Sequence, residues 1–109
     1  MQAPARFMED ADLLAYAEVP SSATFTGRLH LLVGGTRLGR VPRLAICRPH
    51  DEPGLLLLHC NESWGIVGVQ AWNGPGVEAI TTVEAMKRQA ERYYEGLMPS
   101  WKDVPSGDA

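Results

Sequence analysis

The sequence predicts an α+β fold: a four-stranded antiparallel β-meander with a short N-terminal helix and an amphipathic C-terminal helix packed on the sheet. Three patterns lead to this prediction. They are the alternation of apolar and polar residues at 24–33, a wholly apolar strand at 55–60, and a capped amphipathic helix that begins after residue 81. The 109 residues favour a single domain, 1–109, with one hydrophobic core.

The N-terminal helix is expected over residues 7–17. Phe7, Ala11 and Leu14 follow one another at i, i+4 and i+7, which would place them on one face of a helix. Pro20 cannot continue the hydrogen-bond ladder, so the helix should end before it. Residues 1–6 are expected to be mobile.

The first two strands are expected to form a hairpin. Residues 24–33 place Phe25 and Leu31 on one face and polar residues on the other, as in a half-buried strand. Gly34 and Gly35 can adopt the positive φ angles of a two-residue turn. A second strand then returns over 36–48, with a bend at Pro42 because proline has no N–H for the ladder.

The third strand, 55–60, is apolar on both faces, which is typical of a central strand covered on both sides. We expect residues 43–48 to pair with it across the loop 49–54. That register sets Cys47 opposite Leu56 and Cys60 opposite Arg43. A fourth strand is expected over 64–72, before the turn-forming sequence NGPG.

The C-terminal helix has the clearest signals. Thr81, Thr82 and Glu84 resemble a capping box, and Gly96 is the expected helix stop. The apolar stripe contains Val83, Met86, Ala90, Tyr93 or Tyr94, and Leu97, whereas Lys87, Arg88, Glu91 and Arg92 are expected to face water. Trp101 should fold back on the core, and residues 102–109 are expected to be mobile.

Charge is distributed unevenly along the chain. The net charge is −3, but residues 28–48 contain five arginines and no acidic residue. These arginines form the candidate binding surface for an anionic or protein partner: Arg28, Arg37, Arg40, Arg43 and Arg48. The alternative is that they pair with the chain's own acidic residues. A weak nucleic-acid binder is a further alternative, disfavoured by a pI of about 5.5 and by few aromatic residues in the segment.

Tryptophan marks a second candidate surface, because it is enriched at protein interfaces. Trp64, Trp72 and Trp101 pack either in the core or against a partner. A third strand that is apolar on both faces needs cover on both faces, and two helices would provide it incompletely. We therefore expect a homodimer, formed through a sheet face or through the strand 64–72.

The adjacent His59 and Cys60 suggest a thiol and its base, but neighbouring residues in a strand point to opposite faces. We therefore expect both to be packing residues. The alternative is a small thiol- or metal-assisted enzyme that uses Cys60 or Cys47 with a histidine brought from elsewhere. The sequence has no closely spaced cysteine and histidine motif of the CxxC, HxH or HExxH kind, so no cofactor and no metal are expected.

Together these patterns predict a small, soluble, non-catalytic protein-interaction module. An inhibitor, antitoxin-like or immunity-like role is suggested by analogy only. A cytoplasmic location is expected because the N-terminus is acidic, two cysteines suit a reducing compartment, and the longest clean apolar run is only 55–58. A membrane partner is not expected.

Overall fold

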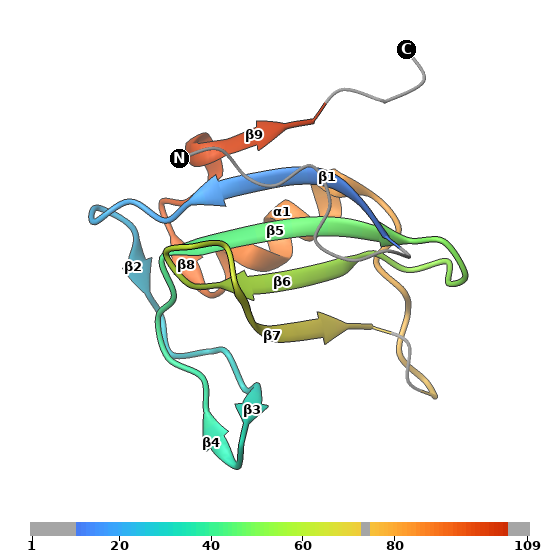
Figure 1. The fold of residues 1–109 in the computed structure, drawn as a ribbon, viewed down its shortest axis with the longest axis horizontal. Coiled ribbons are helices and arrows are strands. Elements are labelled where there is room, and N and C mark those ends of the chain that lie inside the picture. The colour runs from blue at the N-terminus through green and yellow to red at the C-terminus, as the bar shows by residue number, and fades with distance from the viewer. Residues whose placement is uncertain (1–10, 73–74, 105–109) are drawn as a thin grey trace.

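The computed structural model describes residues 11–72 and 75–104. It is mostly β-structure, with a main antiparallel sheet of five strands in the order β7-β6-β5-β1-β9 (Figure 1). The strands of this sheet are β1 (Ala11–Glu18), β5 (Arg43–Pro49), β6 (Leu56–Cys60), β7 (Ile66–Ala71) and β9 (Trp101–Asp103). Two small two-stranded sheets pair β2 (Thr24–Phe25) with β8 (Tyr94–Glu95), and β3 (Leu32–Val33) with β4 (Thr36–Arg37). One α-helix, α1 (Val83–Glu91), and a 3-10 turn, η1 (Met98–Ser100), complete the described elements.

The predicted four-stranded meander with two helices is therefore wrong. The main sheet has five strands and includes the first and the last described elements of the chain, β1 and β9. The described part of the predicted N-terminal helix is strand β1. The sequence ADLLAYAE satisfies a helical spacing, but it also alternates with a period of two. In the structure this segment follows the period of two and forms a strand, in which Ala11, Leu13, Ala15 and Ala17 are all buried. The remainder of that predicted helix, and residues 1–6, lie outside the described residues.

A bulge near Leu14 explains why β1 serves both faces of the sheet. Its pairing with β5 shifts register between Leu13 and Ala15. Ala11 and Leu13 consequently belong to one apolar cluster, and Ala15 and Ala17 to the cluster on the opposite face.

The long first strand predicted at 24–33 is also wrong. Only its two ends are strands, and each pairs with a different element: β2 with β8, and β3 with β4. The predicted turn is confirmed, because Gly34 and Gly35 have φ angles of 60° and 81° and Val33 pairs with Thr36. The return strand breaks near Pro42, where β5 begins one residue later.

The centre of the sheet follows the sequence prediction. β5 pairs with β6 in the predicted register, with Cys47 opposite Leu56 and Cys60 opposite Arg43. All five residues of β6 are buried, as expected for a strand covered on both faces. β7 pairs with β6 and lies at the edge of the sheet.

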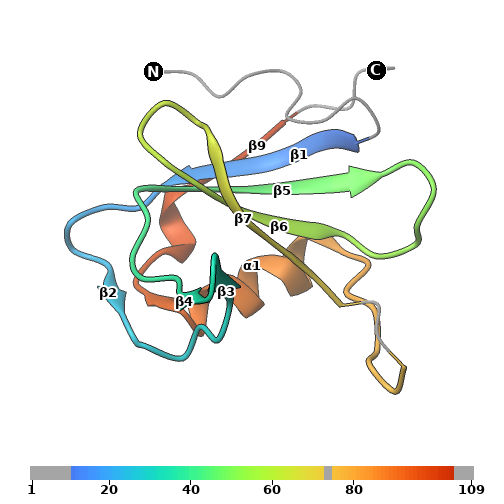
Figure 2. The ribbon, with the colours of Figure 1, turned by 60° about the horizontal axis from the view of Figure 1, so that its bottom comes forward.

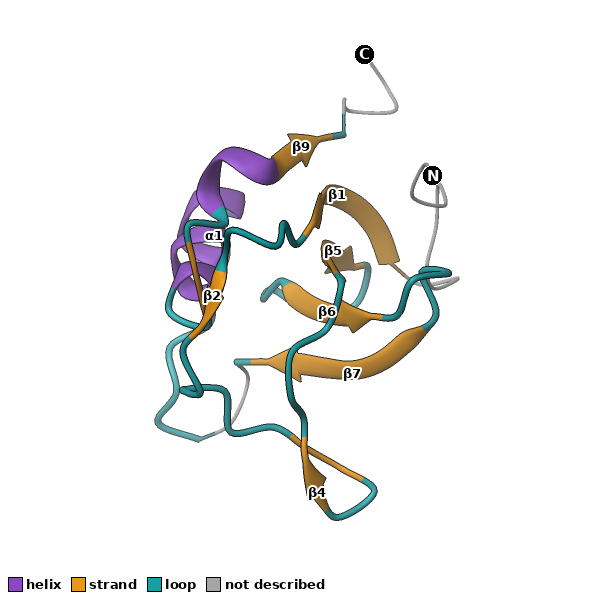
Figure 3. Ribbon diagram, turned by 90° about the vertical axis from the view of Figure 1, so that its left-hand side faces the viewer, coloured by secondary structure: helices purple, strands orange, loops and turns teal. Residues whose placement is uncertain are grey.

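Helix α1 covers one face of the main sheet (Figure 3). Thr82 is its N-cap, and the Thr82 side chain accepts a hydrogen bond from the Ala85 N–H at 3.2 Å. The helix ends at Glu91, earlier than the predicted stop at Gly96, and the following residues form β8. The cluster between helix and sheet includes Met86, Ala90, Tyr94 and Leu97. On the opposite face a smaller cluster gathers around Cys47, Leu58, Cys60 and Trp64.

Candidate functional site

Strand β7 is the more accessible edge of the main sheet. No other strand of the described residues pairs with its outer side, and none of its six residues is charged. Ile66 and Val69 are about 40% exposed, at 39% and 41%, and Ala71 is also exposed. These three residues pair with Cys60, Leu58 and Leu56, so they share one face of the sheet.

The β3–β4 hairpin projects beyond β7 at the start of that strand (Figure 1). Its base packs against Gly68, where an added Cβ would lie 2.8 Å from Leu31 Cδ2 and 3.2 Å from Leu38 Cδ2. Gly68 is therefore a point of close approach between the hairpin and β7. Beyond this contact, Leu32 is 67% exposed and Val33 39% exposed, an unusual exposure for two adjacent large apolar residues.

A second projection lies at the other end of β7. The segment 75–80 extends past the sheet at the end of β7 that is farther from the hairpin, as Figures 1 and 2 both show. Val77 is 48% exposed there, and Glu78 is exposed beside it. The segment is tied to the sheet by the Leu55 N–H, which donates to the Ile80 carbonyl at 2.7 Å. We call β7 with these two flanking projections the β7 edge site.

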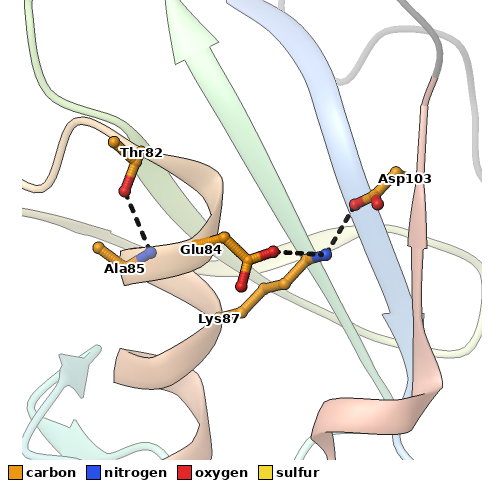
Figure 4. Close-up of polar contacts among 5 residues, drawn as sticks. All are labelled: Thr82, Glu84, Ala85, Lys87 and Asp103. Carbon is orange, nitrogen blue, oxygen red and sulfur yellow. Dashed lines mark hydrogen bonds and ion pairs between the residues drawn. The ribbon is translucent and has the colours of Figure 1, made fainter.

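The opposite edge, β9, is built differently. It has three residues, two of them charged, and follows Pro99 closely. Lys87, buried on α1, donates to Asp103 Oδ1 at 2.8 Å and lies 3.8 Å from Glu84 Oε1 (Figure 4). The prediction that Lys87 faces water is thus wrong, and Lys102 and Asp103 belong to a strand rather than to a mobile tail.

Three of the five arginines proposed as a binding surface make contacts within the chain. Arg37 donates to the carbonyls of Leu29 and Gly27, and Arg40 donates to those of Ala23 and Pro20, both at 2.7 Å. These bonds hold the irregular connection between β1 and β5. The structure does not bring the five together as one contiguous group of unengaged side chains.

Arg43 belongs to a different environment. Its guanidinium lies 3.4 Å from Glu18 Oε1 and 5.0 Å from the ring centroid of Trp64. Arg28 and Arg48 are exposed, and they are the members of the set whose side chains are most available to a partner. Their role as partner contacts remains a prediction.

All three tryptophans pack against the protein's own core. Trp64 is 4% exposed and stacks edge-on to Tyr16, with ring centroids 5.6 Å apart. Its φ of 64° is unusual for a non-glycine residue, and the turn is held by Asn61 Oδ1, which accepts from the Ser63 and Gly65 N–H groups. Trp72 and Trp101 are partly buried against the cluster beneath α1. Trp72 and Trp101 are partly exposed and Trp64 is buried, and an interface at these residues remains a prediction.

The cysteines are free and buried, and burial raises the pKa of each thiol to about 12. An activated thiolate needs a lowered pKa, so this environment opposes nucleophilic chemistry. His59 points to the face opposite Cys60, as expected for neighbours in a strand. Within residues 11–72 and 75–104, no three histidine, cysteine or acidic side chains gather as a metal site.

A buried polar network that sequence reasoning missed links β7 to α1. His59 Nε2 lies 2.8 Å from Gln70 Oε1, and because an amide oxygen only accepts, Nε2 carries the proton. Gln70 Nε2 and Gln89 Nε2 both donate to the Tyr93 hydroxyl, at 3.4 and 2.7 Å. Burial lowers the pKa of His59, which favours the neutral ring. The sequence signal for this network was the presence of two polar residues, His59 and Gln70, at inward positions of neighbouring apolar strands.

Comparison with known proteins identifies no relative: no family model, no curated protein and no solved structure matches the chain. No helix among the described residues is long and apolar enough to cross a membrane.

Proposed function

We propose that this protein is a non-catalytic binding module that takes an extended segment of another protein as an additional strand on β7. The observation that carries the proposal is an uncharged edge strand with exposed apolar side chains. Sheet edges in monomeric proteins are usually blunted by charge, proline or cover, since an open edge pairs with other chains. The main-chain groups of such an edge supply affinity, and the side chains on alternate positions supply specificity.

The binding role is favoured over the thiol-enzyme alternative by the environment of the reactive groups. Both thiols are buried with raised pKa values, and His59 is held by Gln70 inside the core. A catalytic base or nucleophile must reach a substrate, and none of these groups is exposed. The nucleic-acid alternative has less support, because Arg37 and Arg40 are engaged with backbone carbonyls.

Site-specific photocrosslinking in the producing cells tests the proposal. A photoreactive amino acid at Val69 should form a protein adduct, whereas the same group at Thr24, exposed on β2, should not. The captured protein is identified by mass spectrometry, and the complex is then rebuilt from purified components. Binding by the purified pair should fall at least tenfold in Val69→Lys, because a lysine on an edge strand opposes pairing.

Thr24→Lys adds the same charge on a different small sheet and serves as the matched control. Both variants should retain the unfolding midpoint of the parent, since both side chains are partly or fully exposed. Equal adducts at both positions, or undiminished binding by Val69→Lys, would rule out β7 as the binding edge.

A further inference from the structure

The geometry points to a specific kind of partner for the β7 edge site: a single extended peptide segment that carries an acidic residue at the end lying beside the β3–β4 hairpin. This inference rests on the proposed binding role of β7 and adds the chemistry of its partner. It follows from the shape of the edge and from the charges on its two flanks.

Two segments flank the β7 edge, the β3–β4 hairpin and residues 75–80. In the view of Figure 1 the hairpin extends past the first part of β7 and the segment 75–80 extends past its end. A whole sheet brought edge to edge with β7 would meet these projections. A single extended strand of about six residues, by contrast, occupies only the line next to β7. The flanks therefore favour a peptide over the edge of a second folded copy.

Charge then distinguishes the two ends of the site. Arg37 lies on β4 and donates to the carbonyl of Gly27, next to the exposed Arg28, and residues 24–42 contain no acidic residue. Glu78 is the only charged residue between 63 and 83, and it is exposed on the other projection. The hairpin end is therefore basic and the other end acidic, so a bipolar peptide has one preferred placement.

The exposed apolar side chains of β7 determine which residues the middle of the peptide should carry. Val69 and Ala71 present small to medium apolar side chains on the face of the sheet that carries Leu58 and Leu56, opposite the face on which the hairpin packs against Gly68. Cross-strand pairs of β-branched residues stabilise such a ladder by about 0.2–1 kcal/mol each. A partner segment with valine, isoleucine or threonine at successive positions fits this edge, and an internal proline or lysine does not.

The test uses the purified protein and three synthetic hexapeptides with blocked ends: DVTVTK, the neutral SVTVTS, and the proline-containing DVPVTK. Binding is followed by amide chemical shifts in NMR titrations. DVTVTK should bind about three- to tenfold more tightly than SVTVTS at low salt, since two exposed ion pairs contribute about 0.2–1 kcal/mol each. DVPVTK should bind at least tenfold more weakly than DVTVTK, because proline removes a ladder hydrogen bond.

Placement is read with a spin label attached at the aspartate end of DVTVTK. The aspartate is the first residue of DVTVTK, so it reaches the hairpin only when the peptide runs parallel to β7. The expected result is therefore broadening of the amide signals of Leu32 to Arg37 and not of Val77 and Glu78. Glu78→Lys should weaken DVTVTK binding by about threefold or less, and Val69→Lys should abolish it, with Thr24→Lys unchanged. Broadening at Val77 and Glu78 instead, or equal binding of all three peptides, overturns the inference.

Sedimentation equilibrium separates this inference from the proposed function. A protein that dimerises at micromolar concentration, and becomes monomeric in Val69→Lys, would have a second copy as its partner. The peptide inference would then be wrong, while strand addition at β7 would stand. A dimer that Val69→Lys leaves intact, together with failure of all three peptides to bind, would overturn both.

Discussion

The two edges of the main sheet, β7 and β9, have opposite designs. β7 has six uncharged residues, several of them exposed and apolar, and packs on a neighbouring hairpin through a glycine. β9 has three residues, two of them charged, and is fixed to α1 by the ion pair of Lys87 with Asp103. One edge is closed by its own sequence and the other is left able to pair.

This difference teaches which edge of a sheet to test first for a binding partner. Both edges expose backbone groups, so exposure alone does not separate them. The two edges are separated by the charge on the strand and by its contacts with the rest of the fold, because a lysine and a short strand oppose pairing with a further strand. In this protein those two criteria agree, and they select β7.

The largest expected effect comes from removing the glycine beneath the hairpin. Gly68→Val would place a side chain into the space held by Leu31 and Leu38, so it should displace the hairpin base and lower the free energy of unfolding by about 1–3 kcal/mol. Urea denaturation measures this. Gly39→Ala, at a glycine with nothing within 4 Å, is the control and should change stability by less than about 0.5 kcal/mol. Unchanged stability of Gly68→Val would mean that the hairpin is not packed on β7.

A smaller effect is expected at the closed edge. Asp103→Asn removes the carboxylate that faces Lys87 and should lower stability by about 1 kcal/mol, a value discounted because the Asp103 side chain is 70% exposed. Hydrogen exchange should quicken at Val104, whose N–H donates to Leu14, and should not change in β7. Lys102→Gln is the matched control, since it alters charge on the same strand without touching Lys87. Faster exchange in β7 would contradict the independence of the two edges.

The smallest effect is the pH dependence of the network that holds β7. The pKa of His59 is lowered by burial, so below about pH 6.5 the unfolded chain binds a proton that the folded chain resists. Stability from this group is therefore full above that pH and is lost as the pH falls. Between pH 7.5 and 6.0 the loss is at most about 0.8 kcal/mol.

The measurement compares urea midpoints at the two pH values in a background where His30 and His50 are replaced by glutamine. His59→Gln in that background should flatten the difference. NMR of the ring nitrogens of His59 provides a readout that does not need the variant to fold: the ring should gain its proton at a lower pH in the folded protein than in the urea-unfolded chain. Protonation at the same or a higher pH in the folded protein would refute the expectation.

The middle of the fold could be predicted from the sequence because its signals are local. The glycine turn at 34–35, the apolar run that becomes β6 and the capping threonine each fix a short segment without outside help. The register of β5 with β6 follows from the short loop between them. For the same reason Cys47 and Cys60 were correctly placed at separate levels of one face.

The rest required tertiary information. β1 satisfies helical and strand periods equally, and only its burial between β5 and β9 decides between them. Residues 24–33 alternate like a strand, yet the centre of that segment forms bonds to arginine side chains instead of a ladder. The strand of the candidate site was located correctly at 64–72 and was already proposed there as a surface for dimerisation. The opposite edge, β9, was missed because sheet order depends on these nonlocal pairings.

The pairing of β1 with β9 also has a kinetic meaning. Ala15 lies opposite Asp103, so this contact closes a loop of nearly the whole described chain. The length-dependent entropy of such a closure is about 4 kcal/mol, and contacts of this kind slow folding and form late. The β5–β6–β7 ladder can assemble first from neighbouring segments, and it exposes the edge proposed for the partner while the other side of β1 is still unpaired. A nascent chain would thus be able to recruit a strand at β7 before its own sheet is complete.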